Sequence, residues 1–322
     1  MKNIVIVFTG GTFSMKIDEK TGGAVPYYLG QELVNMIPEI GSLANISVYN
    51  FGNYPSPHMT PELMLDLSMV VRKLIKDSKV DGVIITHGTD TLEETAYFVD
   101  LTVKSEKPVV LIGAMRTSSE PDWDGSKNLI DAIYICNNEN SKSMGALVCL
   151  NGEINAASEV TKTHTENMET FHSLDFGALG FVDRGWVVFN RMPRKLEHIE
   201  TEKIDSNVDL IKVYAGINNK FFKFSADSNV HGLVVEALGV GNVPPPAFEG
   251  IQYVLNKGIP VVLTSRCPAG ETLDIYGYPG AGKRLKEAGV IFTDYLNGQK
   301  ARVKLMLSLG QTKDINKIRN LF

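Results

Sequence analysis

NIVIVFTGGT, residues 3–12, runs from a short apolar strand directly into a turn that contains two glycines and a threonine. A second segment, GVIITHGTDT at residues 82–91, repeats this arrangement with another apolar strand, a glycine and further threonines. In an open α/β sheet, ligands bind outside the carboxyl ends of the parallel strands. The two segments therefore predict two turns that present hydroxyl groups at one edge of a shared sheet.

The chain around these segments alternates strand-like and helical patterns. Apolar runs recur at residues 108–113 and 145–150, and residues 60–74 carry apolar side chains at helical spacing behind an N-cap threonine and a proline. Such alternation is typical of βαβ units around a parallel sheet. We expect a larger N-terminal catalytic α/β domain over residues 1–190, with a mainly parallel sheet and helices on both faces.

A charged stretch with few apolar positions, residues 191–209, is interpreted as a linker. A second alternation follows it and predicts a smaller C-terminal parallel α/β domain over residues 210–322. Its strands are expected at residues 211–213, 232–237 and 260–265, and its helices at 247–256 and 299–309.

Composition favours a protein that acts on a small molecule. The 322 residues carry a net charge of −5, and Lys and Arg are scattered along the chain, which argues against nucleic acid or an anionic membrane as a partner. No apolar stretch reaches the length of a membrane span. The first strand begins at Asn3 without a preceding signal-peptide pattern, so we expect a cytoplasmic protein.

Neither metal nor cofactor is expected. The three cysteines, Cys136, Cys149 and Cys267, are distant in sequence and favour buried thiols, and the six histidines show no paired metal spacing. Residues 277–283 fit the spacing of a phosphate loop. However, Arg284 stands where Ser or Thr would have to bind magnesium, and no strand directly precedes the segment.

The two glycine turns carry candidate groups for acyl transfer. A threonine hydroxyl becomes a useful nucleophile when a neighbouring base takes its proton and when N–H donors face the developing oxyanion. Thr12 and Thr89 lie in glycine-containing turns that supply such donors, and Asp90 is placed to bind an ammonium group. The alternative is that both turns are structural and that their threonines cap helices. Thr91 and Glu94 are predicted to form a capping box that opens the helix toward Val103.

A third segment, TKTHT at residues 161–165, adds a candidate base. Lys162 follows the strand at 145–150 and a polar stretch, so we place it beyond a strand end. A lysine that is partly desolvated loses its proton more readily and can then accept one from a hydroxyl. Taken alone, a lysine at such a position is more often a solvated surface lysine than a catalytic base.

Together these segments resemble the bacterial-type L-asparaginases of the asparaginase/glutaminase amidohydrolase family. The resemblance runs in order over essentially the whole chain. The matching segments are TGGT at 9–12, HGTDTLEETA at 87–96, GAMR at 113–116, VTKT at 160–163, GVGN at 239–242 and LNGQKAR at 296–302.

The resemblance implies an enzyme that hydrolyses L-asparagine to L-aspartate and ammonia. Thr12 would be the nucleophile that forms a β-aspartyl ester. Thr89, Asp90 and Lys162 would form the second triad of the family, in which Lys162 deprotonates Thr89 or an attacking water and Asp90 binds the substrate α-ammonium.

The substrate contacts are carried over in the same way. Ser56 would bind the α-carboxylate, and Gly11, Gly88 and Ala114 would contribute backbone contacts. Asn242 matches the residue with which a neighbouring subunit completes the pocket. The resemblance thus implies a homotetramer that is built from dimers with shared active sites.

Two departures from the family pattern leave the activation of Thr12 open. Ala24 stands where family members usually carry a tyrosine on the loop after the nucleophile, although Tyr27 and Tyr28 lie close by in sequence. Tyr276 and Tyr278 occupy the region where other members carry a glutamate. Which of these four phenols partners Thr12 is not decided by the sequence.

A third departure is Pro57, at a position where many members have Gln or another polar residue that contacts the substrate. The loss of that contact is expected to alter affinity or the balance between asparagine and glutamine. The polar, glycine-containing segment 16–29, which includes Tyr27 and Tyr28, is expected to form a lid over the pocket. An ordinary surface connection is the alternative for this segment.

Two other functions fit the same motifs. One is the ammonia-releasing subunit of a tRNA-dependent amidotransferase, which carries an additional N-terminal domain in its known members. The other is a non-catalytic amino-acid sensor, which would bind asparagine without releasing ammonia.

Overall fold

The computed structural model describes residues 1–322, which form two compact units, Met1–His198 and Ile199–Phe322. The division falls within residues 191–209, the segment that the sequence marks as polar and poor in apolar positions.

The first unit contains an eight-stranded sheet of order β12-β11-β8-β7-β6-β5-β1-β4. Five neighbouring strands, β7 to β4 in that order, run parallel, whereas β8, β11 and β12 extend the sheet in antiparallel fashion. The strands are β1 (Asn3–Gly10), β4 (Asn45–Tyr54), β5 (Gly82–Thr86), β6 (Val109–Ile112), β7 (Ala146–Leu150), β8 (Glu153–Ala156), β11 (Gly180–Asp183) and β12 (Trp186–Phe189).

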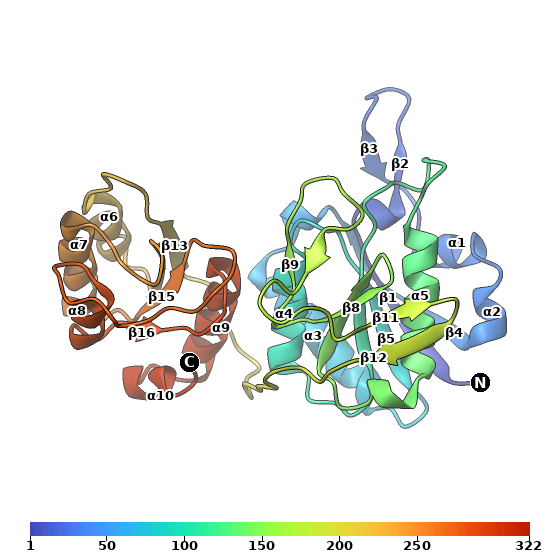
Figure 1. The fold of residues 1–322 in the computed structure, drawn as a ribbon. Coiled ribbons are helices and arrows are strands. Elements are labelled where there is room, and N and C mark those ends of the chain that lie inside the picture. The colour runs from blue at the N-terminus through green and yellow to red at the C-terminus, as the bar shows by residue number, and fades with distance from the viewer. The chain divides into compact units, whose positions relative to one another are not determined.

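Helices cover both faces of this sheet (Figure 1). One face packs against α1 (Gly30–Asn35), α2 (Ile40–Leu43) and α5 (Gly125–Asn137), and the other against α3 (Pro61–Lys76) and α4 (Leu92–Thr102). Side chains alternate between the faces because successive residues of a strand point in opposite directions. In β1, for example, Ile4 and Ile6 join the first core and Val5 and Val7 join the second.

The N-termini of α3 and α4 show how far local sequence signals predict helix capping. Thr60 caps α3 as predicted, since its hydroxyl accepts the amide of Leu63, and Pro61 is the first residue of the helix. The predicted capping box at α4 is wrong. Thr91 precedes that helix without capping it, because its hydroxyl donates instead to the carbonyl of Ser56 at 2.8 Å.

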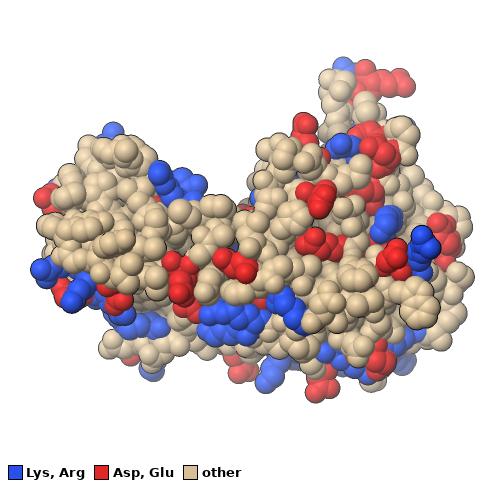
Figure 2. Space-filling view, viewed as in Figure 1, with Lys and Arg blue, Asp and Glu red and all other residues tan.

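Smaller elements complete the first unit. The strands β2 (Met15–Ile17) and β3 (Ala24–Pro26) form a hairpin that projects from the unit, and its tip carries charged side chains of both signs (Figures 1 and 2). A separate pair consists of β9 (Thr161–Lys162) and β10 (Phe171–His172). Three short 3₁₀ turns are η1 (Thr12–Ser14), η2 (Ser56–His58) and η3 (Glu139–Ser141).

The second unit is a four-stranded parallel sheet of order β13-β14-β15-β16. Its apolar core lies between the sheet and α6 to α8, while α9 contacts β13, β14 and β15. The elements are β13 (Val208–Lys212), α6 (Lys220–Asp227), β14 (Gly232–Ala237), α7 (Pro245–Asn256), β15 (Val261–Ser265), α8 (Gly282–Glu287), β16 (Ile291–Phe292), α9 (Gly298–Gln311) and α10 (Ile315–Arg319).

The predicted fold class is confirmed: a larger, mainly parallel N-terminal sheet with helices on both faces precedes a smaller parallel α/β unit. None of the helices has the length and apolar character needed to span a membrane. Cys136 and Cys149 are buried as expected, but Cys267 is exposed because it lies in the loop that follows β15.

Candidate active site

Four turns of the first unit lie at one edge of its sheet. The strands β6, β5, β1 and β4 are neighbours and run parallel, so their carboxyl ends face the same way. Thr12 follows β1, Ser56 follows β4, Thr89 follows β5 and Ala114 follows β6. The topology therefore gathers four of the predicted site residues at a single edge.

Two glycines allow the turn after β1 and the turn after β5 to come into contact. Gly11 has a φ of +78°, and a Cβ atom on it would lie 2.3 Å from both the Cα and the amide nitrogen of Gly88. A Cβ atom on Gly88 would in turn lie 2.6 Å from the Cβ of Ser56. Only glycine fits at positions 11 and 88, since any side chain would push the backbones of these turns apart.

The fourth turn closes on Thr89 in a similar way. A Cβ atom on Gly113 would lie 2.9 Å from the Cγ2 of Thr89 and 3.0 Å from the carbonyl oxygen of His87. Ala114, the next residue, is fully buried. Thr89 is thereby held between the backbone at Gly113 and its polar partners.

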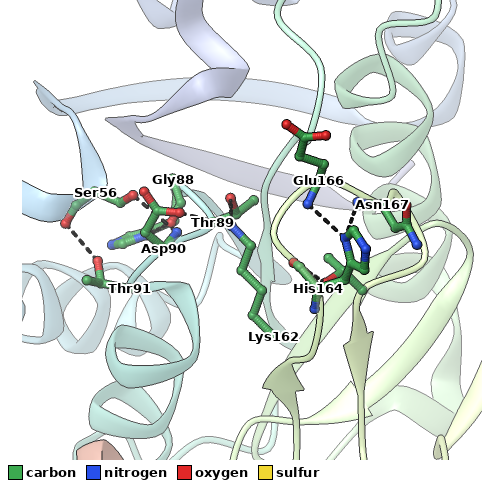
Figure 3. Close-up of polar contacts among 11 residues, drawn as sticks. Ser56, Gly88, Thr89, Asp90, Thr91, Lys162, His164, Glu166 and Asn167 are labelled. Atoms are coloured by element: carbon green, nitrogen blue, oxygen red, sulfur yellow. Dashed lines mark hydrogen bonds and ion pairs between the residues drawn. The ribbon is translucent and has the colours of Figure 1, made fainter.

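Lys162 joins the two side chains that follow Gly88. Its Nζ atom lies 3.0 Å from the Oγ1 of Thr89 and 2.9 Å from the Oδ1 of Asp90 (Figure 3). The Lys162 side chain is only 16% exposed, whereas that of Asp90 is 60% exposed. As an ammonium, Lys162 donates to both oxygens, and as a free amine it would be in position to take the hydroxyl proton of Thr89.

Ser56 connects the turn after β4 to the start of α4. Its hydroxyl accepts the amide of Asp90 at 3.2 Å, and its carbonyl accepts the hydroxyl of Thr91 (Figure 3). Ser56 is 5% exposed, while the neighbouring Pro57 is exposed. The Ser56 hydroxyl therefore lies beside the Asp90 backbone at the edge where Thr89 and Lys162 meet.

His87 supports the turn from inside the protein. The imidazole is fully buried, its Nδ1 lies 2.8 Å from the carbonyl oxygen of Gly88, and its Nε2 lies 3.0 Å from the hydroxyl of Thr95. A carbonyl can only accept, so Nδ1 carries the proton and Nε2 accepts from Thr95. Burial lowers the pKa of His87 to about 4, which keeps the ring neutral at physiological pH.

A carboxylate holds the turn after β6. Asp124 accepts the amide of Met115 with both oxygens at 3.0 Å and the amide of Arg116 at 3.0 Å. Asn128, fully buried on α5, donates to the carbonyl of Gly113 at 3.0 Å and to Asp124 at 3.2 Å. The start of α5 thus fixes the backbone that borders Thr89.

Thr12 begins the turn η1 and is partly exposed. The buried Phe13 beside it packs edge-on against Trp123, with ring centroids 5.6 Å apart. The amides of Tyr27 and Tyr28 both donate to the carbonyl of Ser14 at 3.1 Å, which ties the base of the hairpin to the turn that contains Thr12. Tyr27 is exposed, and Tyr28 packs partly against the core.

Three predicted site residues belong to the second unit. Asn242 accepts the amide of Gly282 at 3.3 Å through its side-chain oxygen. Tyr276 and Tyr278 are both about half exposed, at 48% and 52%, and their ring centroids lie 5.9 Å apart.

A cavity of about 350 Å³ opens beside the Lys162 side chain. It is lined by Asp90, Glu93, Lys162, Thr163, His164 and Thr165. No group of three or more His, Cys, Asp or Glu side chains lies together as a metal site would require.

Three supporting residues, Asp124, Asn128 and His87, were not singled out from the sequence. Asp124 and Asn128 act on a turn that lies 8 to 15 residues earlier in the chain, and their spacing matches an ordinary helix start. His87 lies inside a matching motif, but its burial and both of its partners depend on the packing of the turn against α4.

Comparison with known proteins agrees with this geometry. Residues 3–195 match the family model described as asparaginase, N-terminal, and residues 207–322 match the glutaminase/asparaginase C-terminal domain. The chain is 34% identical to an L-asparaginase of Bacillus licheniformis, with 97% of each chain covered. It is 32% identical to a glutamyl-tRNA(Gln) amidotransferase subunit of Methanobrevibacter smithii, over 99% of this chain and 75% of that protein.

Among solved structures, the probable cytoplasmic L-asparaginase of Campylobacter jejuni superimposes with a TM-score of 0.89 at 36% identity, covering 100% of this chain and 99% of that one. Both domain models, matched in order over nearly the whole length, correspond to the same two α/β units that the structure contains. The chain belongs to the asparaginase family of amidohydrolases.

Proposed function

We propose that this protein is an L-asparaginase that hydrolyses L-asparagine to L-aspartate and ammonia. The observation that carries the proposal is the contact of Lys162 with Thr89 and Asp90, next to the glycine contact that joins this cluster to the Thr12 turn. The L-asparaginase of Bacillus licheniformis matches the chain over nearly equal lengths, which supports the same assignment.

In the proposed reaction, the Thr12 hydroxyl attacks the side-chain carbonyl carbon of asparagine. The hydroxyl proton is transferred to the leaving nitrogen, the carbon–nitrogen bond breaks, and ammonia departs from a β-aspartyl ester. Water then attacks the ester, restores the Thr12 hydroxyl and releases aspartate. Lys162 and Thr89 handle the proton of the attacking group, while N–H donors of the glycine turns stabilise the oxyanion.

Substrate binding is assigned to the surrounding groups. Asp90 binds the α-ammonium, Ser56 the α-carboxylate, and the backbone at Gly11, Gly88 and Ala114 completes the pocket. Pro57 leaves one substrate contact without a polar side chain. We further propose that Asn242 of a second copy completes each site and that the active protein is a homotetramer built from dimers with shared active sites.

The hairpin after Thr12 is proposed as the lid, and one of four phenols as the partner of the Thr12 hydroxyl. Tyr27 and Tyr28 are attached to the Ser14 carbonyl near Thr12, which favours them over Tyr276 and Tyr278. Replacing each tyrosine by Phe identifies the partner as the variant that loses turnover while retaining aspartate binding. We also propose a cytoplasmic location, supported by the description of the Campylobacter jejuni relative.

The function is tested by ammonia release from asparagine by the purified protein and its Thr12→Ala and Thr12→Ser variants. We expect the alanine variant to lose at least about 10³-fold in turnover because the nucleophile is absent, and the serine variant to retain part of it. A Thr12→Ala variant as active as the unchanged protein would exclude Thr12 as the nucleophile.

The same assays separate the two alternatives. A sensor would bind asparagine in a calorimetric titration without releasing ammonia. An amidotransferase subunit would release ammonia productively only with its partner enzyme and charged tRNA, whereas an L-asparaginase releases it alone.

A further inference from the structure

Lys162 belongs to a strand that is too short to fix its position by itself. The strand β9 consists of Thr161 and Lys162 and has only one neighbour, β10, with Lys162 opposite Phe171. Two residues of strand provide very few ladder hydrogen bonds, and the loop of residues 163–170, which connects β9 to β10, directly follows Lys162.

The base of this loop is closed by hydrogen bonds between its two ends. The Thr163 amide donates to the Thr170 carbonyl at 2.7 Å, and the His164 amide donates to the Thr170 hydroxyl at 2.7 Å. That hydroxyl donates back to the His164 carbonyl at 2.7 Å. Thr163 and Thr170 therefore prolong the pairing of the short strands into the loop.

The tip of the loop is held by the imidazole of His164. Its Nδ1 accepts the amide of Glu166 at 3.0 Å and the amide of Asn167 at 3.1 Å (Figure 3). On its outer side, the Glu166 carbonyl accepts the guanidinium of Arg116 at 3.2 Å. The tip is thus fixed between His164 and the turn after β6, which Asp124 holds in place.

We infer that neutral His164 is a positioning residue, which keeps the loop after Lys162 in the shape that places the Lys162 amine against Thr89. The inference rests on the proposed function and names a residue that supports its chemistry. His164 lines the same cavity as Lys162 and Asp90. A shift of the loop backbone would therefore move groups that lie next to the Lys162 amine.

The hydrogen-bond pattern makes this role sensitive to protonation. Both amides need an unprotonated Nδ1, so the proton of the neutral ring sits on Nε2. A proton on Nδ1 removes this acceptor, and the resulting Nδ1–H group would face the amide N–H groups of Glu166 and Asn167. The charged groups around His164 are Asp90, Glu93, Lys162 and Glu166, together with the guanidinium of Arg116.

The test compares two substitutions of the same residue. Asn carries an acceptor oxygen near the position of Nδ1 but does not titrate, whereas Ala supplies no acceptor. At pH 8 we expect His164→Asn to keep kcat/KM within about twofold of the unchanged protein, and His164→Ala to lose at least about fivefold, the effect of one net hydrogen bond of about 1 kcal/mol.

The comparison of Asn with Ala separates the acceptor at Nδ1 from a general effect of losing the imidazole, because both variants lose the ring and only Asn keeps an acceptor. His231→Asn and His231→Ala change an exposed imidazole of the second unit and serve as the control pair, for which kcat/KM of the two variants should be equal.

Hydrogen exchange provides a readout that does not depend on turnover. At pH 8 the peptide containing Glu166 and Asn167 should exchange faster in His164→Ala than in His164→Asn, with thermal melting confirming that each variant is folded. Equal kcat/KM for His164→Asn and His164→Ala at pH 8, or equal exchange in the two variants, overturns the inference. An unchanged protein that releases no ammonia from asparagine at any pH instead removes the proposed function itself.

Discussion

Gly11 and Gly88 are in direct backbone contact, and this contact joins the turn of the proposed nucleophile to the turn that carries Thr89. A Cβ atom on Gly11 would lie 2.3 Å from the Gly88 backbone. The two turns can approach this closely because neither glycine carries a side chain.

Replacing Gly11 by alanine is expected to separate these turns. The positive φ and the backbone overlap together should lower the free energy of unfolding by about 3 kcal/mol, and displacement of Thr12 by about 1 Å should lower kcat about 100-fold. Gly258→Ala is the matched control, since Gly258 also has a positive φ, +75°, but no atom within 4 Å of the added Cβ. Equal losses in both variants would mean that backbone strain alone explains the effect.

Replacing Lys162 by methionine removes the donor to Thr89 and Asp90 with little change in side-chain length. We expect kcat to fall by about 10² to 10⁴, the range for loss of a general acid or base, while aspartate binding weakens much less. Lys142→Met, which removes an exposed lysine paired with Glu139, should retain full activity. Steady-state ammonia release and calorimetry with aspartate measure the two effects, and unchanged turnover in Lys162→Met would contradict the proton-transfer role.

His87 should make the protein less stable in acid. Its pKa is lowered from an ordinary value of 6.5 to about 4 by burial, so the unfolded chain binds a proton that the folded protein excludes. The free energy of unfolding should therefore fall by about 3 kcal/mol as the pH drops from about 6.5 to about 4, and level off below that for this group. Urea unfolding at several pH values tests this.

His87→Gln provides the comparison for that experiment. It should be less stable than the unchanged protein at pH 7, because the contacts with Gly88 and Thr95 are disturbed. It should also lose less stability between pH 6.5 and 4, since glutamine does not titrate. Parallel curves for the two proteins over this range would show that other groups cause the acid sensitivity.

Asp124→Asn tests whether the Asp124 carboxylate holds the turn after β6 in place. One carboxylate oxygen becomes an amide donor that faces the amides of Met115 and Arg116, so we expect a loss of about 2–3 kcal/mol in unfolding free energy. Activity should fall because Gly113 borders Thr89. Asp122→Asn changes an exposed carboxylate that contacts only the Arg116 side chain and should leave both quantities nearly unchanged.

The sequence predicted secondary structure best where a local pattern is compatible with only one type of element. The apolar runs ending in glycine turns predicted β1 and β5, and Thr60 with Pro61 predicted the start of α3. The antiparallel strands β8, β11 and β12 were not anticipated, because residues 153–160 form a polar stretch and each of the three strands is only four residues long.

The candidate site was predictable for its reactive groups but not for its supports. Lys162 was expected beyond a strand end and lies instead in the two-residue strand β9, where its partners are Thr89 and Asp90. The hydroxyl of Thr91 donates to the carbonyl of Ser56 and does not cap its own helix. Hydrogen bonds of this kind depend on which turns lie together in the fold, and the local spacing of residues does not contain that information.

The buried strands of the first sheet contribute no reactive group, since Thr12, Ser56, Thr89 and Ala114 all follow the last residues of their strands. Substitutions that change substrate selectivity can therefore occur in the connecting turns without changing the apolar interior of the sheet. Attempts to redesign its selectivity should begin with the segments 55–57 and 114–117, which lie outside the strands.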